Sequence, residues 1–191
     1  MDEASWHAAL ESARVRVVAG ELRGRRIVAP PGATTRPTTD RVREAVFNAL
    51  GSLGVVDGAA VADLYAGSGA MGIEALSRGA ASCTFVERDR DALRALRENV
   101  EALGLTDRAR VTGGDVMAVA AAIDADVVFV DPPYDFAGWD RLLDALRSPF
   151  VVVESGRALE PTTLAATGWA PTRSKRYGRT WVTFLEHSRA D

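Results

Sequence analysis

The sequence predicts an α/β fold with a mostly parallel sheet of seven strands and helices on both faces. Through most of the chain, short runs of β-forming residues alternate with segments whose apolar residues recur at helical spacing. The last two runs, residues 169–176 and 180–186, are separated only by the turn YGR, which predicts a C-terminal antiparallel hairpin. The 191 residues are enough to bury a sizeable core. Together these observations predict a Rossmann-like fold.

A short basic β-hairpin is predicted to precede this fold. Residues 15–19 and 26–29 are rich in β-forming residues and are separated by the turn-forming stretch GELRGR. A loop rich in proline and threonine follows. We therefore expect residues 1–35 to form a basic tail and hairpin, and residues 36–191 to form the main domain.

The elements of the main domain follow in order. Thr39 can cap a first helix that Gly51 is expected to end, with apolar residues at helical spacing from Val42 to Leu50. The first five strands of the sheet are predicted at residues 60–65, 83–86, 110–112, 127–130 and 150–153. Helices are predicted near residues 71–78, 90–103 and 138–147, with one short helix before residue 127.

Composition limits the chemistry that a site could use. Cys83 is the only cysteine, and the two histidines, His7 and His187, lie near the chain ends, so neither an internal disulfide nor a zinc site is expected. No apolar run approaches the ~20 residues that span a bilayer, and no signal peptide is visible. We therefore expect a cytoplasmic, metal-free monomer.

Charge is distributed unevenly along the chain. Residues 14–43 hold eight arginines against two acids, a net charge of +6, whereas the remaining residues hold 15 basic and 24 acidic side chains, a net charge of −9. A basic arm on an acidic body predicts a polyanionic partner. The same charge is equally compatible with a solvated hairpin that binds nothing.

A glycine-rich motif follows the first strand of the main domain. The stretch DLYAGSGAMGIEAL begins at Asp63 and contains Gly67, Gly69 and Gly72, and Glu87 follows Gly67 by 20 residues. This spacing also fits the dinucleotide fingerprint G-x-G-x-x-G, so an NAD-dependent dehydrogenase is one interpretation. However, Asp63 would repel a pyrophosphate, and it suits a cationic ligand such as the ammonium group of S-adenosylmethionine.

Acids also follow the third and fourth strands. In the stretch GGD, Asp115 could accept a hydrogen bond from an adenine amino group, or it could only cap the next helix. In VFVDPPYDF, the prolines end the strand and orient Asp131 along its direction. The Asp131 carboxylate and the Pro132 carbonyl form a pair of acceptors suited to an NH₂ group, and Tyr134 offers a ring on which a base can stack.

These motifs resemble a known family. DLYAGSGAMGIEAL, FVERD, GGDV and VDPPY are similar, in order and spacing, to the class I S-adenosylmethionine-dependent methyltransferases that methylate exocyclic or amide nitrogens. The upstream stretch AGELRGRRIVAP…RPTTDRVREAVFNAL narrows the resemblance to the bacterial 16S rRNA guanine-N2 methyltransferases of the RsmD family. The resemblance implies methyl transfer to the exocyclic amine of the guanine numbered 966, in 16S rRNA within a small-subunit particle.

The resemblance also implies roles for individual residues. Arg36, Thr38 and Arg41 could close over the methionine end of the cofactor, or the two arginines could contact phosphate. The implied catalytic residues are Asp131, Pro132, Pro133 and Tyr134. The implied S-adenosylmethionine-binding residues are Thr38, Asp63, Tyr65, Gly67, Gly69, Glu87, Arg88, Asp115 and Val116. The implied RNA-binding residues are Arg16, Arg23, Arg25, Arg26, Arg36 and Arg41.

Four other functions are weighed against this one. An adenine-N6 DNA methyltransferase shares DPPY, but this chain is small and shows no separate DNA-recognition domain. A glutamine-N5 protein methyltransferase usually has asparagine at the position of Asp131. A non-catalytic RNA-binding module would not need all four strand-end motifs, and an NAD enzyme has no evident use for DPPY.

Overall fold

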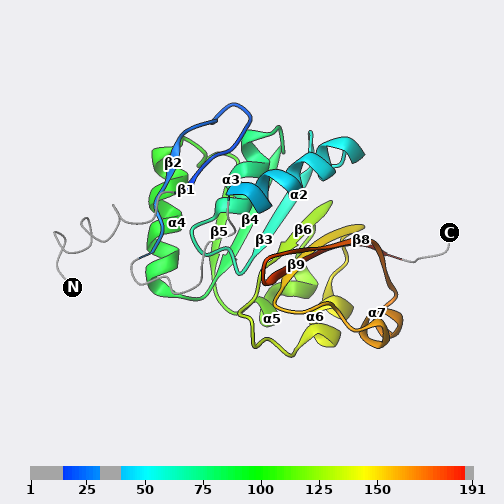
Figure 1. Cartoon of the computed structure of the whole chain (residues 1–191). Coiled ribbons are helices and arrows are strands. Elements are labelled where there is room, and N and C mark those ends of the chain that lie inside the picture. The colour runs from blue at the N-terminus through cyan, green and yellow to red at the C-terminus, as the bar shows by residue number, and fades with distance from the viewer. Residues whose placement is uncertain (1–14, 31–39, 188–191) are drawn as a thin grey trace.

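The computed structural model in Figure 1 describes residues 15–30 and 40–187. Its main sheet has seven strands in the order β5-β4-β3-β6-β7-β9-β8. The five strands from β5 to β7 are parallel, whereas β9 is antiparallel to both β7 and β8. The predicted α/β fold with a mostly parallel seven-stranded sheet and a C-terminal antiparallel hairpin is therefore confirmed.

The strands of this sheet are β3 (Ala60–Leu64), β4 (Ser82–Glu87), β5 (Ala109–Gly113), β6 (Val127–Val130), β7 (Phe150–Ser155), β8 (Trp169–Tyr177) and β9 (Thr180–His187). The helices are α2 (Asp40–Leu53), α3 (Ala70–Ser77), α4 (Arg90–Ala102), α5 (Val116–Val119), the 3₁₀ turn η1 (Ala120–Ala122), α6 (Trp139–Ala145) and α7 (Pro161–Thr167).

One expectation about the helices was wrong, and one helix was missed. Helix α2 continues past Gly51 and ends at Leu53; Gly54 follows with φ of 68°, and the Gly54 and Val55 N–H groups donate to the Gly51 and Leu50 carbonyls. This is a Schellman motif, in which two carbonyls of the last helical turn are paired with N–H groups beyond the helix. Helix α7 was not predicted, although Pro161 at its first turn and Gly168 at its end are ordinary helix signals. The Thr39 cap lies outside the described residues.

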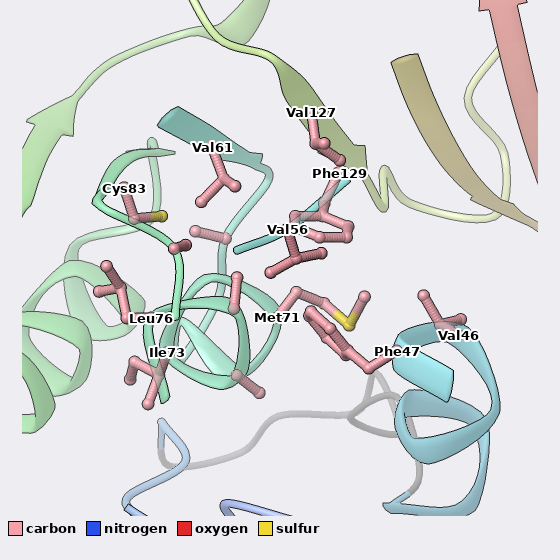
Figure 2. Close-up of a cluster of buried hydrophobic side chains, with 14 of the residues drawn as sticks. Val46, Phe47, Val56, Val61, Met71, Ile73, Leu76, Cys83, Val127 and Phe129 are labelled. Carbon is pink, nitrogen blue, oxygen red and sulfur yellow. The ribbon is translucent and has the colours of Figure 1, made fainter. Parts of the chain in front are cut away.

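Helices cover both faces of the sheet, and each face has its own apolar core. One cluster packs α2, α3 and α4 against the sheet, and the other packs α5, α6 and α7 against the opposite face. In the first cluster the Phe47 and Phe129 rings lie 5.4 Å apart, which joins α2 to β6. Figure 2 shows the Phe47 ring of α2 reaching toward Met71.

The N-terminal hairpin, β1 (Val15–Arg16) with β2 (Arg26–Ile27), is antiparallel as predicted, but its strands are shorter. It is bound to α3 and α4 by hydrogen bonds from its backbone. The Leu22 N–H donates to Ser77 Oγ (3.0 Å), and the Val28 N–H donates to Asn99 Oδ1 (2.8 Å). Its buried residues belong to the same core cluster as α3. The division of the chain at residue 35 remains a prediction.

A buried ion pair joins the hairpin to α2 and α3. The Glu74 carboxylate accepts hydrogen bonds from the N–H groups of Val18 (2.7 Å) and Ala19 (3.0 Å) and from Arg78 Nε (2.7 Å). Arg43 of α2 places its Nε 3.5 Å from Glu74 Oε2 and donates from Nη2 to the Arg16 carbonyl. The side chains of both Glu74 and Arg43 are 0% exposed. One carboxylate therefore accepts hydrogen bonds from the hairpin and from Arg78 and also lies against the charge of Arg43.

Glu74→Gln should destabilise the protein by ~3–5 kcal/mol, because it breaks the fully buried pair and leaves Arg43 only the partly exposed Asp40 (2.9 Å) as a carboxylate partner. Chemical denaturation of the variant measures this loss. The matched control is Glu98→Gln, which breaks the exposed pair of Arg94 and Glu98 on α4 (3.0 Å) and should cost less than about 1 kcal/mol. Equal losses in the two variants would contradict the role of Glu74 as the link between these segments.

Candidate active site

Four neighbouring parallel strands bring the motif residues to one edge of the sheet. Strands β5, β4, β3 and β6 are adjacent in that order, so their carboxyl ends lie together. Asp63 lies near the end of β3, Glu87 ends β4, Asp115 follows β5 and Asp131 follows β6. In open α/β sheets, ligands bind at this edge, next to the point where the strand order reverses. Here that point lies between β3 and β6, because β4 and β5 follow on one side of β3 and β6 lies on the other.

Glu87 holds the glycine loop in place. Its Oε2 accepts a hydrogen bond from the Gly67 N–H (2.8 Å), and its Oε1 accepts from the N–H groups of Arg88 (2.7 Å) and Asp89 (2.8 Å). Gly67 has φ of 54°, and no atom lies within 4 Å of where its Cβ would be, so the space beside the loop is open. A carboxylate offers about four acceptor positions, so one is left for a further donor. Binding of ribose hydroxyls by Glu87 remains a prediction.

Asp63 fixes the start of α3 from inside the protein. The residue is 3% exposed, and its Oδ2 accepts a hydrogen bond from the Gly72 N–H (2.8 Å). Burial raises the pKa of the Asp63 carboxyl from 3.8 to about 7, against the opposing effect of the Gly72 hydrogen bond and with a smaller contribution from the charge of Glu87. Asp63 thus has a positioning role that the sequence analysis did not assign. Contact between Asp63 and a cationic ligand remains a prediction.

The raised pKa predicts how stability changes with pH. Because the folded-state value of about 7 exceeds the ordinary 3.8, the folded protein retains a proton that the unfolded chain releases between these values. The contribution of Asp63 to stability is therefore greatest at low pH and is lost as the pH rises toward 7. Asp63→Asn cannot titrate, so its stability relative to the wild type should increase by up to ~1.4 kcal/mol per pH unit from about pH 4 to 7 and level off above. Urea unfolding of both proteins measures this difference, and a difference independent of pH contradicts the prediction.

Tyr65 connects the end of β3 to the loop after β6. It has φ of 61°, which is uncommon for a residue other than glycine. Its ring meets Phe136 edge-on at 5.8 Å, and Phe136 meets Trp139 in the same way at 5.0 Å. Burial and the nearby Asp115 raise the pKa of the Tyr65 hydroxyl, and Arg88 partly offsets this. Phe136 and Trp139 were missed in the sequence analysis, although both lie just after DPPY.

Asp115 caps helix α5. Its Oδ1 accepts a hydrogen bond from the Met117 N–H (2.9 Å), so Asp115 does cap this helix. Val116 beside it is buried, at 2% exposed. The cap leaves Oδ2 of Asp115 for another donor, and contact with an adenine amino group remains a prediction.

The DPPY motif forms a turn at the end of β6. The Asp131 N–H donates to the Leu64 carbonyl (3.4 Å), which places Asp131 beside the end of β3. The Phe136 N–H donates to the Pro133 carbonyl (2.9 Å) and closes the turn, with Pro132 buried and Asp131 exposed. The Pro132 carbonyl accepts no hydrogen bond from any residue that the structure describes.

Tyr134 of this motif is 60% exposed. Its hydroxyl lies 3.3 Å from Thr180 Oγ1 at the start of β9. Its ring packs on Gly156, where a Cβ would come within 2.8 Å of the ring. Gly156 and Thr180 carry no sequence signal of this role, because the contact joins distant segments. The ring therefore presents an open surface at the same edge as Asp131.

The structure does not bring all the predicted RNA-binding arginines to this edge. Arg16 pairs with Asp40 (3.1 Å). The Arg25 guanidinium donates to the carbonyl of Ala102, the last residue of α4 (2.9 Å), and Glu21 at the hairpin tip pairs with Arg108, just before β5. Helix α4 begins beside the carboxyl ends of the strands and runs back toward their amino ends. The hairpin tip, with Arg23 and Arg25, therefore lies beside the amino ends of the strands, opposite the candidate active site.

The remaining predicted residues are placed differently. Arg26 pairs with Arg16 in the hairpin ladder and is exposed. Arg41 lines a groove between α2 and β8. Arg36 and Thr38 lie outside the described residues. Within the described ranges, no helix is long and apolar enough to cross a membrane, and no three His, Cys, Asp or Glu side chains are grouped to hold a metal ion.

Comparisons with known proteins agree with this arrangement. The family described as Conserved hypothetical protein 95 matches residues 15–186. The chain is 39% identical over 181 residues to "Putative rRNA methyltransferase YlbH" of Bacillus subtilis, covering 88% of this chain and 96% of that protein. It is 43% identical over 125 residues to "Ribosomal RNA small subunit methyltransferase D" of Escherichia coli K12, covering 64% of this chain and 62% of that protein, which is less than two thirds of its length.

A solved structure shows the same fold. "Putative methyltransferase yhhF from Escherichia coli" superposes with a TM-score of 0.76 at 32% sequence identity, over 93% of this chain and 100% of that chain. The family match over residues 15–186 spans the hairpin, the strands of the sheet and the four strand-end motifs. The resemblance noted in the sequence is thereby confirmed, and the chain belongs to the RsmD family of ribosomal RNA small subunit methyltransferases, described as Conserved hypothetical protein 95.

Proposed function

We propose that this protein transfers a methyl group from S-adenosylmethionine to the exocyclic N2 amine of a guanine in 16S rRNA, the guanine numbered 966. The observation that carries the proposal is the DPPY turn, in which the backbone of Asp131 is bonded to Leu64 at the end of β3, the strand from which the glycine loop follows. Membership in the RsmD family and the names of the Bacillus and Escherichia relatives support rRNA over DNA as the substrate.

The glycine-loop side of the site would hold the cofactor. Glu87 has one acceptor position left for a ribose hydroxyl, Asp115 has Oδ2 left for an adenine amino group, and Gly67 leaves open space beside the loop. Asp63 places a carboxylate beneath this loop, where a cationic ligand would favour its ionised form. When bound, S-adenosylmethionine supplies the methyl group on a positively charged sulfur.

The DPPY side would hold and orient the guanine. The N2 lone pair of guanine is delocalised into the ring, which makes the amine a poor nucleophile. Asp131 and the Pro132 carbonyl can each accept one of its N–H bonds, which directs the lone pair toward the methyl carbon. Tyr134 can stack on the base. Orientation of this kind supplies on the order of 7–11 kcal/mol of barrier reduction without a metal or a covalent intermediate.

Charge develops on the amine during transfer, and Asp131 is placed to stabilise it. As the new carbon–nitrogen bond forms and the carbon–sulfur bond breaks, positive charge moves from sulfur to nitrogen. The amine then releases one proton and becomes neutral. The target base must also leave any stem in which it is paired before it can enter the site.

The test is methyl transfer by the purified protein with labelled S-adenosylmethionine. Small-subunit particles and naked 16S rRNA, both from cells that lack the gene, are offered as substrates, and the nucleosides are identified by mass spectrometry. We expect N2-methylguanosine as the product and small-subunit particles as the preferred substrate. We also expect the enzyme to act as a monomer in the cytoplasm. N6-methyladenosine, label in DNA only, or no transfer would overturn the proposed function.

A further inference from the structure

A basic groove lies between helix α2 and the edge strand β8. Its volume is about 400 Å³, and the small side chains of Ala45 and Ala49 form part of its lining. The polar residues that line it are Arg41, Asn48, Ser52, Arg173, Lys175 and Tyr177. No acidic residue lines the groove. The groove therefore carries positive charge, whereas the chain outside residues 14–43 has a net charge of −9.

The geometry of β8 explains why its cations face this groove. Arg173, Lys175 and Tyr177 alternate along the strand and so lie on one face of the sheet. Their partners across the ladder are Phe184, Val182 and Thr180. Phe184 and Val182 are buried in the same core cluster as α2, so the shared face is the one that α2 covers.

The cations of the groove are not neutralised by the protein. Within the described residues, none of Arg41, Arg173 and Lys175 forms an ion pair with a carboxylate. The Arg173 guanidinium lies 5.9 Å from the centre of the Phe184 ring, and the Lys175 amine lies 5.2 Å from that of Tyr177. Such contacts hold the stems in place while the charges stay available to a ligand.

One end of the groove adjoins the candidate active site. Tyr177 is paired across the ladder with Thr180, and Thr180 Oγ1 lies 3.3 Å from the hydroxyl of Tyr134 in the DPPY motif. From this point Lys175 and Arg173 follow along β8, about 3.3 Å per residue. A ligand that reaches Tyr134 can therefore continue into the groove without crossing another element of the sheet.

We propose that this groove binds the sugar–phosphate backbone of the RNA strand that flanks the methylated guanine. The inference rests on the proposed function and names the surface that grips its substrate. A groove lined by cations, with aromatic rings at its end, is the arrangement that binds single-stranded nucleic acid. The hairpin tip is a poorer candidate, since Arg25 is bonded to α4 and lies at the opposite edge of the sheet.

The double substitution Arg173→Gln with Lys175→Gln tests the groove. We expect KM for small-subunit particles or 16S rRNA to increase about 10-fold, and the slope of log affinity against log salt to fall by roughly 1–2 units. S-adenosylmethionine affinity and kcat should stay within about 2-fold. The matched control is Arg97→Gln with Arg110→Gln, which removes two exposed arginines from α4 and from β5, the other edge strand. Equal effects in the two double variants overturn the inference.

Lys175 also offers a direct readout, because it is the only lysine in the chain. Acetylation by an amine-specific reagent, followed by mass spectrometry, reports on Lys175 alone, with the amino terminus as the reference amine. A naked 16S rRNA transcript should slow acetylation of Lys175 at least about 5-fold without slowing that of the reference. The variant Lys175→Arg keeps the charge and should retain wild-type KM, which separates loss of charge from misfolding.

These outcomes distinguish failure of the inference from failure of the proposed function. If the wild type methylates rRNA but Lys175 is not protected and the salt slope is unchanged in the groove variant, the groove inference is wrong and the proposed function stands. If the wild type methylates no RNA, the proposed function is wrong whatever the state of Lys175. Because particles are expected to be preferred, naked RNA is offered at a concentration at which the wild type methylates it; protection of Lys175 by particles but not by this RNA would indicate a protein partner and would also overturn the inference.

Discussion

Asp131→Ala should lower the rate of methyl transfer by at least about 10²–10³-fold, the usual cost of losing one preorganised group that stabilises developing charge. The affinity for S-adenosylmethionine should stay within a few-fold, because Asp131 lies at the end of β6 and the expected cofactor residues follow β3, β4 and β5. Folding should be little affected, since Asp131 is exposed. Single-turnover kinetics and calorimetry measure the two quantities separately.

Two further variants make this experiment specific. Asp131→Asn keeps an acceptor oxygen but not the charge, so it should retain an intermediate rate. Asp135→Ala removes an exposed carboxylate from the same loop and should leave the rate within about 3-fold of the wild type, because Asp135 follows the DPPY motif and has no assigned part in holding the amine. Full activity of Asp131→Ala would remove the DPPY turn from the chemistry.

Glu87→Ala should weaken S-adenosylmethionine binding by ~1.5–3 kcal/mol, the range for a lost charge-assisted hydrogen bond. The structure adds a second cause of weakening, since Glu87 also holds the N–H groups of Gly67, Arg88 and Asp89. Calorimetry on the wild type, on Glu87→Ala and on the matched Glu87→Gln gives the total loss. Unchanged affinity would show that Glu87 has no part in cofactor binding.

A ligand without the ribose hydroxyls separates the two causes. If Glu87 binds those hydroxyls, Glu87→Ala should cost less affinity for the deoxy analogue than for S-adenosylmethionine, by a coupling energy of about 0.5–3 kcal/mol. If Glu87 acts only by holding the loop, both ligands should lose the same affinity. The comparison therefore tests direct contact, which a single affinity cannot do.

Much of the active-site edge could be predicted because its signals are local. Glycines beside an acid predict a tight turn at a strand end, and a residue before Pro-Pro is forced into extended geometry, so Asp63, Glu87, Asp115 and Asp131 were placed correctly at four strand ends. The aromatic contact of Tyr65 with Phe136 could not be predicted, because it depends on how closely the ends of β3 and β6 approach each other.

The end of α2 shows a different limit. Gly51 lowers helix propensity by only ~1 kcal/mol, which packing of the apolar face of α2 outweighs, so the helix continues to the glycine that forms the Schellman motif. The buried pair of Glu74 and Arg43 was likewise invisible in the sequence. The groups that meet at the Glu74 carboxylate come from the hairpin, from α2 and from α3, and nothing in the spacing of these segments along the chain indicates that they meet.

The sequence by itself determined the fold class, the family and the four strand-end motifs, because periodicity and turn chemistry act within a few residues of each other. It also located an excess of arginine near the N-terminus, but charge along a chain does not determine where that charge lies in space. Only the tertiary structure decided that the hairpin tip with Arg25 lies at the edge opposite DPPY. Only it brings Arg173 and Lys175, more than 130 residues from Arg41, into one groove beside Tyr134, since the directions of strands and helices are set by packing of the whole core.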